Sequence, residues 1–164
     1  MHDRRSQRIR EQLRQHPNPR SHDRALTPSF ADQLRRTYLP PHAAPMSVAF
    51  APDGARFGTA TRDRALKVWD MEGKEIFTLQ NLPRAVNSLA FSPDGRHLAG
   101  ADEAGTIQLW DSGGREVAGL RGHECRVQAI AFRPDGRHLA GAGADGTLRV
   151  WEVPSGRERH CLRG

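Results

Sequence analysis

Short apolar stretches alternate with turn residues along most of this chain. The stretch AIAF at 129–132 precedes a Pro-Asp-Gly turn at 134–136, in which Pro presets φ and Gly accepts a positive φ. TLRVW at 147–151 follows a second turn and alternates polar with apolar side chains, as a half-buried strand does. A further strand is expected after Pro154-Ser155-Gly156. The pattern therefore predicts a four-stranded antiparallel meander of roughly 40 residues.

This pattern occurs three times at a constant interval. Two aromatic positions recur every 41 residues: Phe50, Phe91 and Phe132, and Trp69, Trp110 and Trp151. A period of about 40 to 45 residues with a Trp-Asp ending is typical of propeller blades, which must stack because one sheet cannot cover its own apolar faces. We therefore predict an all-β chain, a partial β-propeller of three four-stranded antiparallel blades. The expected blades are residues 42–80, 81–121 and 122–164, after a short helical or disordered leader at residues 1–41.

The three units resemble the blades of WD-repeat proteins over about residues 42–164. The resemblance rests on the Pro-Asp-Gly turns at 52–54, 93–95 and 134–136, on Gly122-His123, on Asp145-Gly146-Thr147 and on the endings at 69–70, 110–111 and 151–152. It implies that a His, a hydroxyl on the second strand, an Asp in the following turn and the Trp form a hydrogen-bonded tetrad in each blade. It also implies a non-catalytic scaffold that binds a protein or peptide partner.

The tetrad is expected to differ from blade to blade. In blade one either Thr59 or Thr61 can supply the hydroxyl, and in blade three Gly141 and Gly143 stand where the hydroxyl is expected, so that one bond is missing. Blade two lacks both the His and the Asp, and we expect it to be the least rigid unit because a buried hydrogen bond contributes about 0.5 to 1.5 kcal/mol. The expected positions are His42, Thr59, Asp63 and Trp69 in blade one, Trp110 in blade two, and His123, Asp145 and Trp151 in blade three.

Partners of such propellers commonly dock on the loops that enter each blade and on the turns between the second and third strands. Arginine is enriched in binding hot spots, and arginines occur in these loops. The alternative interpretation is an ordinary solvated rim, since acidic residues are intermixed. The candidate partner-binding residues are Arg62, Arg64, Arg84, Arg121 and Arg126.

No sequence motif of a catalytic site is present. The glycines at 141–146 match G-x-G-x-x-G, but strand-patterned residues follow them where a phosphate site needs a helix. Cys125 and Cys161 have no second pair at metal-binding spacing. We therefore expect no enzyme, no cofactor and no metal. The N-terminus lacks the apolar region of a signal peptide, and we expect a cytoplasmic protein.

The leader carries most of the chain's charge. It contains nine arginines and four acidic residues, a net charge of +5 out of +6 for the whole chain. The alternative function is therefore weak, salt-sensitive binding of nucleic acid or another acidic surface through the leader. Within it, Phe30, Leu34 and Tyr38 recur every four residues after Thr27-Pro28, which predicts a short helix.

The number of blades bears on the wider protein. Propellers use about 4 to 8 blades, so three blades predict further blades in a longer parent chain, or self-association of two copies into a six-bladed ring. A third interpretation is a regulatory module of a catalytic domain that is absent from this sequence.

Overall fold

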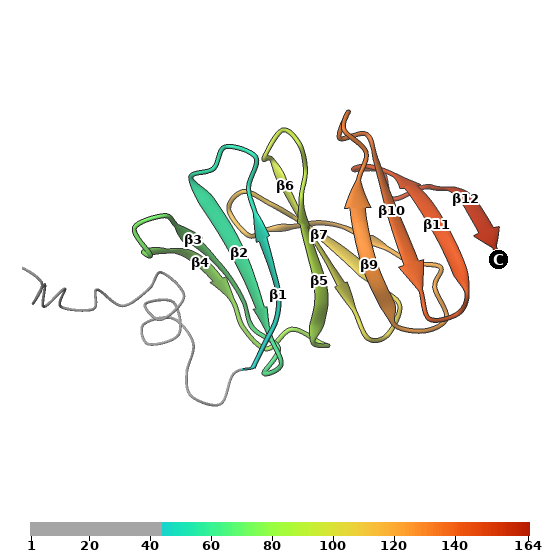
Figure 1. Cartoon of the computed structure of the whole chain (residues 1–164), viewed down its shortest axis with the longest axis horizontal. Helices are drawn as coiled ribbons and strands as arrows, with labels where there is room; N and C mark the ends of the chain where they lie inside the picture. Colours follow the sequence, from blue (N-terminus) through green and yellow to red (C-terminus); the bar gives the residue numbers. More distant parts are fainter. Residues whose placement is uncertain (1–43) are drawn as a thin grey trace, which may run out of the picture. The chain divides into compact units, whose positions relative to one another are not determined.

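The computed structural model describes residues 44–164, which form twelve β-strands in three four-stranded antiparallel sheets (Figure 1). In every sheet the strands lie in chain order. Blade one contains β1 (Pro45–Phe50), β2 (Arg56–Thr61), β3 (Leu66–Asp70) and β4 (Glu75–Leu79); blade two contains β5 (Val86–Phe91), β6 (His97–Asp102), β7 (Ile107–Asp111) and β8 (Glu116–Leu120); blade three contains β9 (Val127–Phe132), β10 (His138–Gly143), β11 (Thr147–Glu152) and β12 (Glu158–Arg163). The predicted fold class is confirmed. The leader, with its expected helix, lies outside the described residues.

Each Pro-Asp-Gly sequence closes the hairpin between the first two strands of its blade. In blade one the N–H of Ala51 donates to the carbonyl of Arg56 at 2.9 Å, and the N–H of Gly54 donates back to Ala51 at 3.0 Å. Gly54, Gly95 and Gly136 have φ values of 67°, 68° and 70°. This left-handed conformation favours glycine because it has no Cβ, so the turn recurs with the repeat.

The alternation of side chains gives each sheet two apolar faces. We call the face that meets the preceding blade the leading face, and the face that meets the following blade the trailing face. One core joins the trailing face of blade one to the leading face of blade two through Ala60, Leu66, Val68, Val86 and Trp110. The other joins the trailing face of blade two to the leading face of blade three through Ala99, Ile107, Leu109, Leu139 and Trp151. Blade two is thus covered on both sides.

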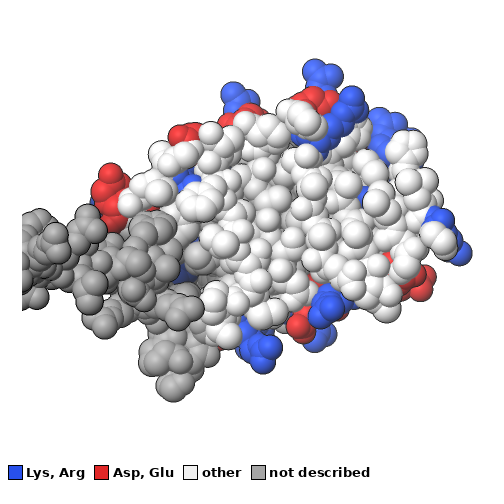
Figure 2. Space-filling model, viewed as in Figure 1, with Lys and Arg blue, Asp and Glu red and all other residues white. Residues whose placement is uncertain are grey.

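The first strands of the blades, β1, β5 and β9, lie beside one another (Figure 1). The N–H of Leu89 donates to Oγ of Ser47 at 3.0 Å, and the N–H of Ile130 donates to Oγ of Ser88 at 3.3 Å. A serine 41 residues further on would continue this series, but the chain has Ala129 there. These strands carry no charged side chain, and Figure 2 shows the charged groups gathered along the two ends of the blades.

Among the described residues no helix is long and apolar enough to cross a membrane.

Candidate protein-interaction surface

A buried polar network holds the loop before β9 against the turn between β10 and β11. Nδ1 of His123 lies 3.0 Å from Oδ2 of Asp145, and the two side chains are 0% and 7% exposed. The carboxylate also accepts hydrogen bonds from the N–H of Glu124 at 3.0 Å and from the hydroxyl of Thr147 at 2.7 Å. The structure thus brings together the predicted His and Asp of blade three, which are 22 residues apart.

Backbone carbonyls take the place of the hydroxyl that blade three lacks. Nε2 of His123 lies 3.2 Å from the carbonyl oxygen of Gly141, and the indole N–H of Trp151 donates to the carbonyl of Arg121 at 3.1 Å. A Cβ on Gly141 would lie 3.0 Å from both Ile107 Cδ1 and Trp151 Cζ3, which is closer than ordinary van der Waals contact. The expected missing bond is therefore not a gap, because both ends of the interrupted tetrad have a main-chain partner.

The network acts on the ionisation of Asp145. Burial by itself would raise the pKa of this carboxyl group, but hydrogen bonds from the Thr147 hydroxyl, the Thr147 and Glu124 amides and the His123 ring outweigh burial. Together they hold the pKa well below its ordinary value because they stabilise the charged form. Asp145 is therefore an ionised structural anchor for two loops.

In blade one the structure distinguishes the two threonines that the sequence left open. The indole N–H of Trp69 donates to Oγ1 of Thr59 at 3.0 Å, so Thr59 supplies the hydroxyl on the second strand. The hydroxyl of Thr61 instead bonds the carboxylate of Asp63, in the following turn. His42 lies outside the described residues, and its expected place in this tetrad stays a prediction.

Blade two replaces the polar network with apolar packing. Leu82, at the position of the expected His, is 9% exposed and belongs to the same core cluster as Trp110 and Val86. A Cβ on Gly100 would lie 2.8 Å from Trp110 Cζ3, so the indole rests directly on this glycine. The sequence analysis noted what blade two loses in hydrogen bonding and missed what Leu82 adds to its core.

Three of the five candidate arginines line one open depression of about 370 Å³ at the junction of blades one and two. Within residues 44–164, no carboxylate oxygen lies within 4.0 Å of a nitrogen of any of these three side chains. One acidic residue is present in the lining, so the depression carries an excess of positive charge. It is lined by Arg62, Arg64, Pro83, Arg84, Ala85 and Glu103.

The other two candidates, Arg121 and Arg126, are exposed beside blade three and do not line this depression. Their main chains have structural roles: the carbonyl of Arg121 accepts from Trp151, and the carbonyl of Arg126 accepts from the N–H of Ala144 at 2.8 Å. The five arginines therefore do not form a single cluster.

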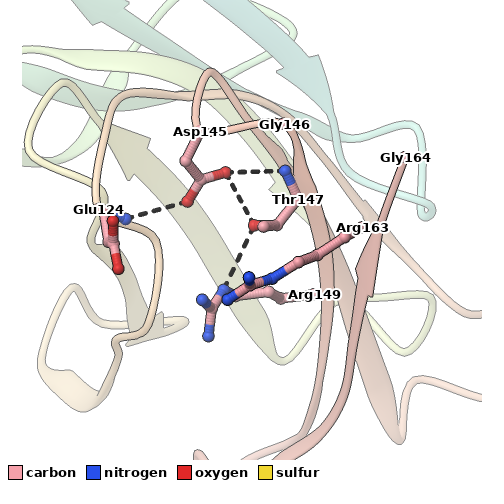
Figure 3. A pocket seen from close by; sticks show the side chains of 7 residues that line it. All are labelled: Glu124, Asp145, Gly146, Thr147, Arg149, Arg163 and Gly164. Atoms are coloured by element: carbon pink, nitrogen blue, oxygen red, sulfur yellow. Dashed lines mark hydrogen bonds between the residues drawn. The ribbon is translucent and has the colours of Figure 1, made fainter.

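A second hollow, of about 260 Å³, lies beside the His123 network (Figure 3). Its charges balance, since two carboxylates face two guanidinium groups, and Arg149 already pairs with Glu158 at 2.8 Å. It is consequently a weaker candidate for binding a charged partner than the depression at the first blade junction. Its lining consists of Glu124, Asp145, Gly146, Thr147, Arg149, Arg163 and Gly164.

The other sequence motifs occupy ordinary places in the sheets. The glycines at 141–146 end β10 and form the turn to β11, and a strand follows them as predicted. Cys125 and Cys161 are unpaired and exposed. Across residues 44–164, no group of three or more His, Cys, Asp or Glu is placed to hold a metal ion.

The fold and the loop surface define a protein built from stacked propeller blades. The family described as WD domain, G-beta repeat matches the chain at residues 33–70, 73–111 and 114–152, which is more than half of its length. The chain therefore belongs to the WD-repeat family. Folds of this family generally act as non-catalytic scaffolds that bind protein partners.

Solved structures show the same fold. The structure of U3-55K matches with a TM-score of 0.72 and 22% identity, over 77% of this chain and 41% of that chain. The crystal structure of the RRP9 WD40 repeats matches with a TM-score of 0.73 and 22% identity, over 77% and 40%. The chain thus spans about two fifths of either structure. A comparison with curated proteins finds no match.

Proposed function

We propose that this chain is a non-catalytic scaffold that binds an acidic segment of a partner protein in the depression lined by Arg62, Arg64 and Arg84. The observation that carries the proposal is the convergence of these three guanidinium groups without an ion pair among the described residues. Other arginines of the blades, such as Arg56 and Arg149, are neutralised by carboxylates at 2.9 and 2.8 Å. A cluster that lacks internal partners suits an external anion.

The chemistry of the lining favours carboxylates on a peptide. Guanidinium groups bind carboxylates in a bidentate geometry, and Arg is enriched in interface hot spots. Pro83 and Ala85 add apolar contact beside the charges. A volume of about 370 Å³ accommodates a few side chains, not a folded domain. The partner is therefore an extended acidic segment, and we expect the encounter to occur in the cytoplasm.

Direct titration tests this proposal. A fluorescent Asp/Glu-rich peptide is titrated with the wild-type chain and with the triple variant Arg62→Gln/Arg64→Gln/Arg84→Gln. The matched control, Arg96→Gln/Arg137→Gln/Arg157→Gln, removes the same charge from exposed positions outside the depression. We expect the first variant to lose at least tenfold in affinity and the control to stay within about twofold, since distant charges are screened at physiological salt. Equal losses in both variants would show that only net charge attracts the peptide.

A further inference from the structure

The trailing face of blade three carries the same residue pattern that the other two blades bury. Its central positions are alanines, and larger aliphatic side chains surround them on β11 and β12. In blade two the equivalent side chains are all 0% exposed, because blade three covers them. In blade three Leu148 is 41% and Leu162 is 57% exposed. The equivalent sets are Ala99, Ala101, Ile107, Leu109 and Leu120 in blade two, and Ala140, Ala142, Leu148, Val150 and Leu162 in blade three.

The covering surface is also repeated within this chain. In blade two, Leu89 and Phe91 of β5 pack over Gly58 of blade one. In blade three, Ile130 and Phe132 of β9 pack against the core that contains Ala99. The third copy of this pair of side chains is on β1 of blade one, where Val48 is 60% and Phe50 is 58% exposed.

These two surfaces are complementary in size. Leading faces present large side chains on their first strands, and trailing faces present Gly or Ala at the position that receives them. Ala140 holds that receiving position in blade three, 41 residues after Ala99. Two trailing faces placed together would set small side chains against small side chains, which packs poorly. The repeat therefore favours contact between unlike faces.

We propose that the trailing face of blade three binds blade one of a second copy of this chain, and that two copies close into one six-bladed ring. The contact continues an interface that the chain already forms twice, between blades one and two and between blades two and three. Two-fold closure uses the same pair of surfaces at both junctions, so each copy buries both its exposed β1 side chains and its exposed β11 and β12 side chains. Six blades lie within the range of about 4 to 8 that propellers use.

One difference separates this junction from the two internal ones. Ser47 and Ser88 each accept a hydrogen bond from the first strand of the following blade, at 3.0 and 3.3 Å. Blade three has Ala129 at the equivalent position. The proposed junction therefore lacks this polar contact, and Ala129→Ser supplies a hydroxyl for the N–H of Val48 of the second copy.

Sedimentation velocity of the full chain at micromolar concentration tests the ring. A β1 variant, Val48→Glu/Phe50→Glu, and a trailing-face variant, Leu148→Glu/Leu162→Glu, change only exposed side chains. Ile76→Glu/Val117→Glu is the matched control, since both residues are exposed on the fourth strands, at 45% and 43%. We expect dimers for the wild type and the control, monomers for each interface variant, and a dissociation constant lowered severalfold by Ala129→Ser.

Mixing the two interface variants gives the decisive result. A mixed dimer regains one unaltered junction, formed by β1 of the trailing-face variant and blade three of the β1 variant. We expect native mass spectrometry to detect this mixed dimer, which also shows that both variants are folded. A wild-type chain that stays monomeric overturns the proposal. So does a dimer that survives the β1 variant, because that result indicates contact between two trailing faces or another surface.

Discussion

Nδ1 of His123 lies 3.0 Å from Oδ2 of Asp145, and this pair ties the loop before β9 to the turn between β10 and β11. The His123 ring also meets Trp151 edge to face, with centroids 5.5 Å apart. Two long-range connections of blade three thus pass through one buried imidazole.

Replacement of this imidazole is expected to destabilise the chain. His123→Ala removes a partner from the Asp145 carboxylate and leaves a space beside Trp151, so we expect a loss of about 1 to 3 kcal/mol in the free energy of unfolding. Urea denaturation followed by tryptophan fluorescence measures it. The control is His138→Ala, since His138 is half-buried and its Nδ1 has no hydrogen-bond partner within residues 44–164. Identical midpoints for both variants would mean that the His123 network contributes nothing measurable.

The same pair makes stability depend on pH. The folded-state pKa of Asp145 is lower than its unfolded value near 3.8, so Asp145 stabilises the fold above that value and loses this contribution as the pH falls below it. The pKa values of Asp94, Asp111 and Asp53 are lowered as well, which adds to acid sensitivity. Comparison with Asp145→Asn isolates the contribution of Asp145. We expect the melting temperatures of variant and wild type to differ most at pH 6 to 7 and to converge toward pH 3; a constant difference would argue against the linkage.

Restoring the family's hydroxyl in blade three is expected to fail. Gly141→Ser places a Cβ 3.0 Å from Ile107 and Trp151, in a core where nearby atoms have little space to move. We expect a loss of about 1 to 3 kcal/mol from overpacking, although the new hydroxyl matches Thr59 of blade one in position. Gly119→Ser is the control, because the nearest atom to its Cβ is 4.0 Å away. Thermal melts of both variants decide the sign, and a stabilised Gly141→Ser would show that blade three adjusts to accept the side chain.

Hydrogen exchange distinguishes the two estimates of blade rigidity. The sequence predicts faster exchange in blade two, which lacks the tetrad. The structure favours the opposite order, because apolar cores cover blade two on both sides whereas β12 is exposed along its whole length. We expect amides of residues 86–111 to exchange more slowly than those of 127–151 in mass spectrometry. The reverse order would mean that the tetrad outweighs stacking.

The leader provides a separate prediction about charge. Any binding of DNA or RNA is expected to reside in residues 1–41, which hold nine arginines, and to weaken steeply with salt. Fluorescence anisotropy compares the whole chain with one that starts at Pro41. Binding that persists without the leader would instead assign it to the arginines of the blades.

The sequence by itself determined the repeat, the strands and the main partners within blade three. The interval of 41 residues, the Pro-Asp-Gly turns and the alternation of TLRVW are local or periodic signals, and they predicted the twelve strands in three sheets. His123 and Asp145 were identified by their places in the repeat, so their contact needed no knowledge of the packing between blades.

Only the tertiary structure decided how the blades compensate for missing residues and which surfaces they leave exposed. The carbonyls of Gly141 and Arg121 replace a hydroxyl, and Leu82 replaces a His, through contacts that no motif encodes. Leu148 and Ile107 hold equivalent positions in the repeat, yet one is 41% and the other 0% exposed. The physical reason is the same in each case: burial and partnership depend on which side chains of neighbouring blades meet in space, and a single repeat does not contain that information.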